Sequence, residues 1–283
     1  MINKRNISVF FLFFMMTSCL FSQQAAYQFP LFSNRIKQKL QTLSRDSALR
    51  FCEKTQCFVD EVGYLITPKR ALLDSAMLGH LPTLAHVLST GLVSPNCLDG
   101  RGCFPLQEVL DGYDYGFFSH DPLPCMELLL QCGASPNGLW HDQMPLIFRA
   151  IEINNFNMVD MLLKYGADIE KLGKYGYSII HWLMSPIQSF LKYGKDDDAR
   201  RERAKIAQLL IQEYANKMHQ AIDQDDDRTI KSLVRLLNSV PDNIPGRQLS
   251  DILTFVLACR NEQGISLQKR VEAYFVEKKD KDY

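Results

Sequence analysis

The chain has 283 residues, with 32 Lys and Arg against 32 Asp and Glu, so its formal net charge is zero. Hydrophobic residues make up 46% and charged residues 23%, ordinary values for a folded globular protein that exclude a disordered tail, a collagen-like chain and a polytopic membrane protein. The balanced charge argues against a broad basic surface, so we expect no nucleic-acid partner.

The amino terminus has the features of an export signal. Lys4 and Arg5 precede an apolar run over residues 7–16, and small polar residues follow it. The run is shorter than the span of about 20 residues that a membrane helix needs, so we predict a signal peptide over residues 1–22. The alternative is a short anchor that is never cleaved. Without Lys4 and Arg5 the mature chain has 30 basic and 32 acidic residues, a net charge of −2.

The same leader allows a second interpretation. Met16, Thr17, Ser18 and Cys19 resemble a bacterial lipobox, in which the cysteine becomes the lipidated first residue, although methionine stands where leucine is usual. We expect a secreted or periplasmic protein, and the alternative is a protein anchored to the cell envelope by lipid on Cys19. Membrane contact is expected only through such an anchor.

Apolar residues at helical spacing follow the leader. Ile36, Leu40, Leu43 and Leu49 predict a helix, and we assign residues 23–66 to an N-terminal helical cap.

Similar segments recur through the middle of the chain. Residues 128–137 read LLLQCGASPN and residues 161–170 read MLLKYGADIE, which places Gly133 and Gly166 33 residues apart. An earlier copy covers residues 83–91, and a later copy, which lacks the glycine, covers residues 206–215. In each copy an apolar run ends a helix, and glycine suits the left-handed cap that closes it. A weaker fifth copy covers residues 219–237.

A period of turn, helix and glycine-ended helix resembles the ankyrin repeat. The matching residues are Asp99, Gly102, Pro105 and Leu106 at one unit's start, Gly176, Ser178, Ile180 and His181 at another's, and Gly79 and His80 in the turn between helices. The resemblance implies an all-α fold, an ankyrin-like helical repeat solenoid with short hairpin turns and helical caps. It assigns residues 67–240 to four or five repeats and residues 241–283 to a C-terminal helical cap with a charged tail.

Two insertions lengthen the period, at residues 111–121 and 188–203. The first contains four aromatic residues, Tyr113, Tyr115, Phe117 and Phe118. They either form a second contact patch or fold back over the solenoid.

The resemblance implies that the chain binds other proteins through its hairpin tips and the concave face of the first helices. Carried over by position, the predicted partner-binding residues are Arg101, Trp140, His141, Asp142, Met144, Glu152, Lys174, Tyr175 and Tyr177. Trp, Tyr and Arg are common among binding hot spots. The alternative for Trp140 and Tyr175 is packing on adjacent hairpins. We expect a monomer with one or more protein partners.

A direct search for catalytic motifs argues against an enzyme. The sequence contains no Gly-x-Ser-x-Gly, HExxH, P-loop or GxGxxG motif, and its six histidines have no metal-ligand spacing. We therefore expect no catalysis, no cofactor and no metal, and we interpret the acidic runs at residues 196–198 and 225–227 as solvated loop charge. Two alternatives stay open: a structural envelope lipoprotein, and an enzyme with an unrecognised site in residues 188–203.

The eight cysteines are too few for a disulfide scaffold in a chain of this length. Cys97 and Cys103 lie symmetrically about Gly100, the expected tip of a hairpin, so they could face each other and form a disulfide. Cys52 and Cys57 could pair only if the predicted helix breaks between them.

Overall fold

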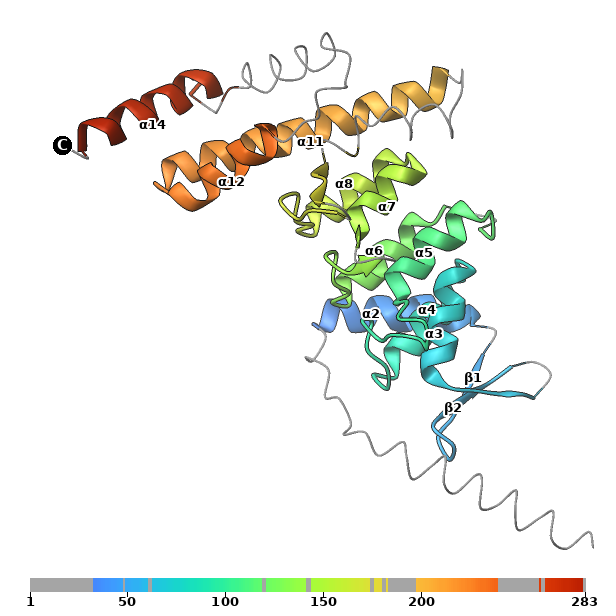
Figure 1. The fold of residues 1–283 in the computed structure, drawn as a ribbon. Coiled ribbons are helices and arrows are strands. Elements are labelled where there is room, and N and C mark those ends of the chain that lie inside the picture. The colour runs from blue at the N-terminus through green and yellow to red at the C-terminus, as the bar shows by residue number, and fades with distance from the viewer. Residues whose placement is uncertain are drawn as a thin grey trace, which may run out of the picture. The chain divides into compact units, whose positions relative to one another are not determined.

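The computed structural model describes residues 33–47, 49–60, 63–118, 121–140, 144–173, 176–179, 182, 197–238, 260 and 263–281 (Figure 1). This part of the chain is mostly helical and has two small antiparallel sheets. It divides into two compact units, one formed by Met1–Gly112 and Phe117–Ala134 and the other by Tyr113–Gly116 and Ser135–Tyr283. We call them unit 1 and unit 2 and describe each by itself. The predicted leader, with Cys19, lies outside the described residues.

Unit 1 begins with helix α2, Asn34–Leu43, and a short 3-10 turn, Ser44–Asp46. The Ser33 hydroxyl caps the helix by accepting a hydrogen bond from the backbone N–H of Ile36 at 3.4 Å. Leu40 is buried, and α2 packs against α4, Leu81–Ser89. The first part of the predicted helical cap is therefore present.

An antiparallel sheet follows α2, where we predicted that the helical cap continues to residue 66. Its strands, in the order β1-β2-β3, are β1 (Arg50–Cys52), β2 (Cys57–Val59) and β3 (Leu65–Ile66). The prediction of helix was wrong here because Phe58 is buried from a strand, where its ring packs 5.3 Å from that of His86 in α4. Aromatic residues favour such a half-buried pleated surface.

The first helix pair of unit 1 consists of α3, Pro68–Met77, and α4. Gly79 has a φ of 68°, a left-handed conformation that allows the sharp turn between the two helices. The next residue, His80, caps α4, because its Nδ1 accepts a hydrogen bond from the backbone N–H of Thr83 at 3.3 Å. The turn predicted from Gly79 and His80 is confirmed.

The second helix pair consists of α5, Pro105–Asp114, and α6, Leu123–Gln131. Leu129 of α6 is fully buried. Gly133 has a φ of 92°, and the backbone N–H of Ala134 donates to the carbonyl of Leu129 at 2.9 Å. These are the features of a Schellman cap, which satisfies carbonyls left free at the end of a helix. The glycine-ended helix predicted for this copy is confirmed.

The end of the first insertion folds back onto unit 1. The ring of Phe118 lies so close to Gly79 that a Cβ added there would be 2.4 Å from it. A Cβ added at Gly112 of α5 would be 2.0 Å from the backbone oxygen of Met77 and 2.9 Å from the Phe118 ring. Both glycines therefore allow close approach, and Phe118 belongs to the packing rather than to a contact patch.

Unit 2 contains a short hairpin and a helix pair. The hairpin strands are β4 (Leu139–Trp140) and β5 (Met144–Pro145), and the helices are α7 (Leu146–Ile153) and α8 (Phe156–Lys164). Asn154, with a φ of 60°, takes the left-handed position between the two helices that glycine takes in unit 1.

A side-chain amide connects neighbouring repeats in both units. In unit 1, Nδ2 of Asn96 donates to the carbonyl of Gly133 at 2.8 Å. In unit 2, Nδ2 of Asn137 donates to the carbonyl of Gly166 at 2.9 Å, and its Oδ1 accepts from the backbone N–H of Asp168 at 2.7 Å. The contacts recur at equivalent places, so the repeats stack in register within each unit.

The predicted helix end at residue 215 is wrong. Instead, α11 continues without a break over Asp197–Asp223, and α12 follows over Asp227–Asn238. The copy at residues 206–215 is the one that lacks the glycine, and residues 197–223 contain neither glycine nor proline to end the helix. The fourth and fifth copies therefore share a helix. The buried Tyr214 hydroxyl joins it to α12 by donating to the carbonyl of Leu233 at 3.1 Å.

The charge at residues 225–227 is partly structural. The Asp226 carboxylate caps α12 by accepting from the backbone N–H of Thr229 at 3.1 Å. Hydrogen bonds with the side chain and the backbone of Thr229 lower the pKa of Asp226. The last described helix is α14, Leu267–Lys281, which packs on α11 with an ion pair between Arg270 and Asp223. In the described part of the chain no helix is both long enough and apolar enough to cross a membrane.

Candidate partner-binding site

The residues predicted to contact a partner fall into different environments. Arg101 lies on a turn of unit 1 with 69% of its side chain exposed, and Tyr177 is exposed in unit 2. Glu152 is partly buried and pairs with Arg149 at 3.5 Å. The side chain of Trp140 and the residues His141, Asp142, Lys174 and Tyr175 lie outside the described part.

Met144 corrects one of these predictions. It is 4% exposed, and its sulfur lies 3.0 Å from the position that a Cβ on Gly173 would take. Met144 lies in strand β5, at the turn position that Cys103 takes in unit 1, and both side chains are buried, so transfer by position assigned a buried residue to the surface. Met144 is therefore not available to a partner.

The turn that contains Arg101 is closed by hydrogen bonds that Asp99 both donates and accepts. The backbone N–H of Asp99 donates to the carbonyl of Cys103 at 2.8 Å. The Asp99 carboxylate accepts from the backbone N–H of Arg101 at 2.7 Å and from that of Cys103 at 2.8 Å. Gly102, with a φ of 85°, completes the turn. The backbone below Arg101 is thus held in one conformation.

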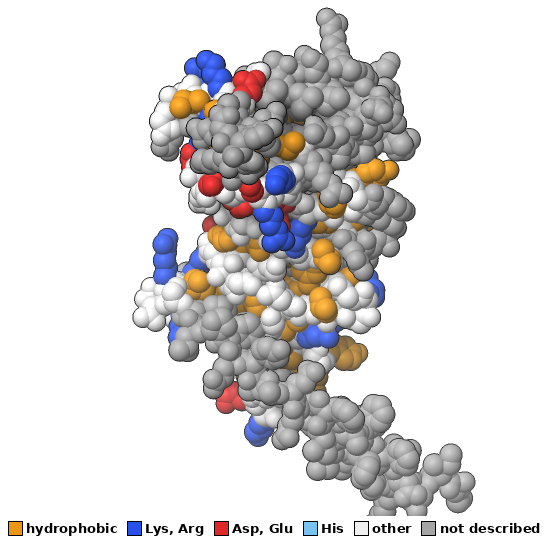
Figure 2. Space-filling view, turned by 60° about the vertical axis from the view of Figure 1, so that its left-hand side comes forward, with side chains coloured by type: hydrophobic (Ala, Val, Ile, Leu, Met, Phe, Trp, Pro, Cys, Tyr) orange, Lys and Arg blue, Asp and Glu red, His pale blue; other side chains and the backbone are white. Residues whose placement is uncertain are grey.

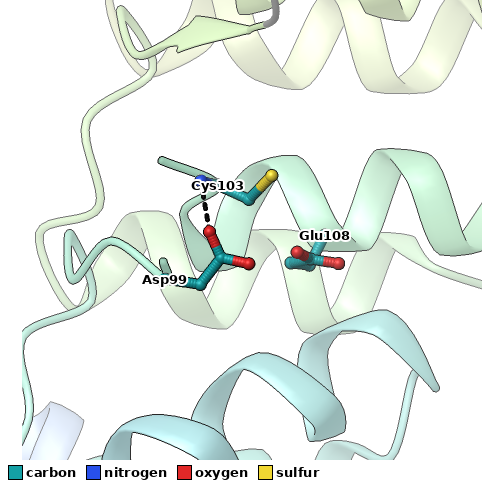
Figure 3. Close-up of side chains that lie close together, drawn as sticks. All are labelled: Asp99, Cys103 and Glu108. Carbon is teal, nitrogen blue, oxygen red and sulfur yellow. Dashed lines mark hydrogen bonds between the residues drawn. The ribbon is translucent and has the colours of Figure 1, made fainter. Parts of the chain in front are cut away.

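The side chains below this turn form the one cluster in the described residues with the composition of a metal site. Oxygen atoms of Asp99 and Glu108 and the sulfur of Cys103 lie within 4.8 Å of one another (Figure 3). However, the Arg101 guanidinium contacts both carboxylates, Asp99 at 2.8 Å and Glu108 at 3.1 Å. A cation would compete with this guanidinium, so we interpret the cluster as a clamp that fixes the turn.

The charges of the clamp are consistent with that interpretation. Burial alone would raise the pKa of Asp99, but the hydrogen bonds from Arg101 and from the Cys103 backbone outweigh it and lower this pKa. Burial raises the pKa of Glu108, and Arg101 opposes that effect. The hydrogen bond to Asp99 raises the pKa of Arg101. The arginine therefore stays charged and holds both acids.

A turn of the same form recurs in unit 2. The backbone N–H of Gly173 donates to the carbonyl of Tyr177 at 2.8 Å, as Asp99 does to Cys103. Gly176, with a φ of 75°, corresponds to Gly102. Tyr177 therefore occupies the position of Cys103, but it is 37% exposed, whereas Cys103 is buried. The two turns present different side chains from a similar backbone.

Sequence reasoning missed a set of exposed leucines beside these turns. Leu98 in unit 1 and Leu139 and Leu172 in unit 2 are 54%, 49% and 49% exposed. Each follows by two residues the repeat position of Asn96, Asn137 or Glu170. The recurrence of leucine six or seven residues after the glycine that ends a helix was the signal that could have identified them. Figure 2 shows hydrophobic side chains exposed among charged ones on one face.

The cysteines of the first turn do not face each other across it. Cys103 is opposite Asp99, and its sulfur accepts a hydrogen bond from Nε2 of Gln107 at 3.4 Å. Burial raises the pKa of Cys97 to about 11. No disulfide joins any two of the six described cysteines, and the possible bridge between Cys97 and Cys103 stays a prediction.

A polar cavity of about 470 Å³ lies at the C-terminal end of unit 2. It is lined by Asn216, His219, Gln220, Asp223, Gln224, Arg260 and Gln263. Nδ1 of His219 is 3.0 Å from the Arg270 guanidinium, which also pairs with Asp223. The lining is thus entirely of polar and charged side chains, two of which, His219 and Asp223, contact Arg270. Residues 188–196 of the insertion 188–203, where an enzyme site was considered, lie outside the described part.

Comparisons with known proteins give a limited result. No protein-family model matches the chain, and the search of curated proteins also found no match. Among solved structures, the chain is similar to the human ASB11 ankyrin repeat domain at 21% sequence identity, with a TM-score of 0.36, covering 69% of this chain and 89% of that one. The paired helices and the turns between them are observed directly in the structure of this chain.

Proposed function

We propose that this chain is a non-enzymatic, exported repeat protein that binds a protein partner through its turns and the adjacent exposed leucines. The observation that carries the proposal is the recurrence of an exposed leucine at the same repeat position three times. Large apolar side chains that are exposed at a recurring repeat position offer apolar area that a protein partner could cover. Arg101 and Tyr177 add two residue types that are common in binding hot spots.

The turns favour binding because little of their backbone has to be ordered. The Asp99 clamp in unit 1 and the Gly173–Tyr177 bond in unit 2 fix the backbone before a partner arrives. A preorganised surface loses less conformational entropy on association, so more of the contact energy contributes to affinity. This is how a repeat surface without a deep pocket can bind specifically.

Photocrosslinking in cells tests this surface directly. A photoreactive residue in place of Leu139 or Leu172 should yield the same crosslinked partner. Ile265 in unit 2, which is 45% exposed, is the matched control position and should not yield it. The double variant Leu139→Ala, Leu172→Ala should lose the partner, while Ile265→Ala should retain it. Equal recovery with both variants would refute the proposed surface.

Export is the second part of the proposal and rests on the leader alone. We propose cleavage after residue 22, with lipidation of Cys19 as the alternative that would make the chain an envelope lipoprotein. Sequencing the mature amino terminus distinguishes the two. Palmitate labelling that disappears in Cys19→Ser would favour the lipoprotein, whereas a chain that retains Met1 would exclude both.

A further inference from the structure

The hairpin of unit 1 brings two cysteines into direct opposition. In the pairing of β1 with β2, the Cα partner of Cys52 is Cys57. Directly opposite residues of an antiparallel pair have Cα atoms about 4.5–5.5 Å apart and point their side chains to the same face. A disulfide requires a Cα separation of about 4.4–6.8 Å. The sheet therefore gives Cys52 and Cys57 the Cα separation that a disulfide needs, which the predicted helix would not have allowed.

The hairpin is held in this register without a covalent bond. On one side Phe58, the neighbour of Cys57, is buried between the rings of Phe51 and His86, each with its centroid 5.3 Å away. On the other side the turn is closed by the Gln56 side chain, whose Nε2 donates to the carbonyl of Glu53 at 2.9 Å. The two cysteines thus stay opposite each other while reduced, and oxidation requires little rearrangement of the backbone.

The two thiols are also more accessible than three of the other four described cysteines. Cys52 and Cys57 are half-buried, whereas Cys103, Cys125 and Cys132 are buried. Hydrogen bonds with the side chain and the backbone of Thr55 lower the pKa of Cys52. Burial raises the pKa of Cys125 to about 12 and that of Cys132 to about 11. Because the thiolate is the nucleophile, Cys52 is the thiol that should react first.

We propose that Cys52 and Cys57 form a reversible disulfide that closes the β1–β2 hairpin, by exchange with a low-molecular-weight disulfide such as oxidised glutathione. The Cys52 thiolate attacks one sulfur of glutathione disulfide and releases one glutathione thiolate, which leaves a mixed disulfide. The Cys57 thiolate then attacks the Cys52 sulfur and releases the second glutathione thiolate. The protein loses two electrons and two protons, and one glutathione disulfide becomes two glutathione molecules. This modification site is independent of the proposed partner surface.

Trypsin provides a specific test, because Lys54 lies between the two cysteines. Digestion after Arg50, Lys54 and Lys69 places Cys52 in the peptide FCEK and Cys57 in TQCFVDEVGYLITPK. The full chain is equilibrated with mixtures of reduced and oxidised glutathione, blocked with a maleimide and digested without reductant. We expect the two peptides to appear joined in oxidising mixtures and separately blocked in reducing ones, with a transition between them.

The controls separate this bond from nonspecific oxidation. In Cys52→Ser the joined species should disappear, and Cys57 should instead carry maleimide or a single glutathione; Cys57→Ser should give the reciprocal result. The same digest cleaves after Arg101 and so reports separately on a bridge between Cys97 and Cys103. Two blocked, unjoined peptides at every ratio of the glutathione buffer, or a Cys52 that joins another cysteine in the folded chain, would overturn the proposal.

Discussion

The amide of Asn137 provides a quantitative test of repeat stacking in unit 2. Its side chain makes two hydrogen bonds with the backbone of the following repeat, donating to the Gly166 carbonyl at 2.9 Å and accepting from the Asp168 N–H at 2.7 Å. A typical intramolecular hydrogen bond contributes about 0.5–1.5 kcal/mol net. Asn137→Ala should therefore lower the free energy of unfolding by about 1–3 kcal/mol.

Two measurements check this value. Thermal unfolding followed by circular dichroism should shift to lower temperature by about 2–4 °C for each kcal/mol lost in a chain of this size. Hydrogen exchange gives a local readout, because the Asp168 amide loses its acceptor and should exchange faster than in the wild type. Asn157, exposed on α8, is the matched control, and Asn157→Ala should change stability by less than about 0.5 kcal/mol.

The reasoning would be refuted by a specific pattern. If Asn137→Ala and Asn157→Ala unfold together and the Asp168 amide keeps its wild-type exchange rate, the amide does not connect the repeats. A loss of stability without faster exchange at Asp168 would also contradict the geometry, since it would place the effect elsewhere.

Three further predictions concern packing and charge. Leu162→Ala should cost about 2–5 kcal/mol in a denaturant titration, because Leu162 is fully buried in α8, whereas Leu172→Ala should change little. Gly112→Ala should lower the melting temperature despite the better helix propensity of alanine, because a Cβ there would meet backbone 2.0 Å away, while Gly100→Ala, with open space, should not. Burial lowers the pKa of His86, so the unfolded chain takes up the proton first and stability should fall as the pH drops below about 6.5; a His86→Gln chain with the same pH slope as the wild type would contradict this.

The glycine signal explains which helix ends the sequence could predict. Where glycine follows the apolar run, as at Gly133 and Gly166, the left-handed turn is present, with φ of 92° and 86°. Where glycine is missing, after residue 215, nothing in the local chemistry stops the helix, and α11 continues to Asp223. The apolar pattern locates a helix, but the chemistry of the cap decides where it ends.

The sheet at β1–β3 could not be predicted in the same way. Its strands have two or three residues each, too short for an alternating pattern to be recognised. What determines the structure is the burial of Phe58 against His86, residues 28 positions apart in the chain. The contact between Phe58 and His86 therefore outweighs the helical spacing of the apolar residues, which extends only to Leu49.

The predicted partner-binding residues show how far a position in the repeat pattern predicts the exposure of a side chain in this chain. The transfer succeeds in placing Arg101 and Tyr177 on the surface, since their turns have the length of the pattern. It fails at Met144, which is buried in strand β5 just as Cys103 is buried at the equivalent position of the first turn. The exposed leucines, in contrast, recur six or seven residues after the glycine that ends a helix, and all three are on the surface.

This difference makes the leucines the stronger basis for the proposed surface. A single exposed leucine needs no explanation, because folded proteins expose much apolar area. Three leucines at one repeat position, in two units, share a backbone environment that turns each side chain outward. Leu98 and Leu172 lie beside the turns that hold Arg101 and Tyr177, so their exposure recurs with the repeat. A partner that contacts one turn should therefore contact the leucine beside it, and losing the leucine should weaken binding without changing the stability of the fold.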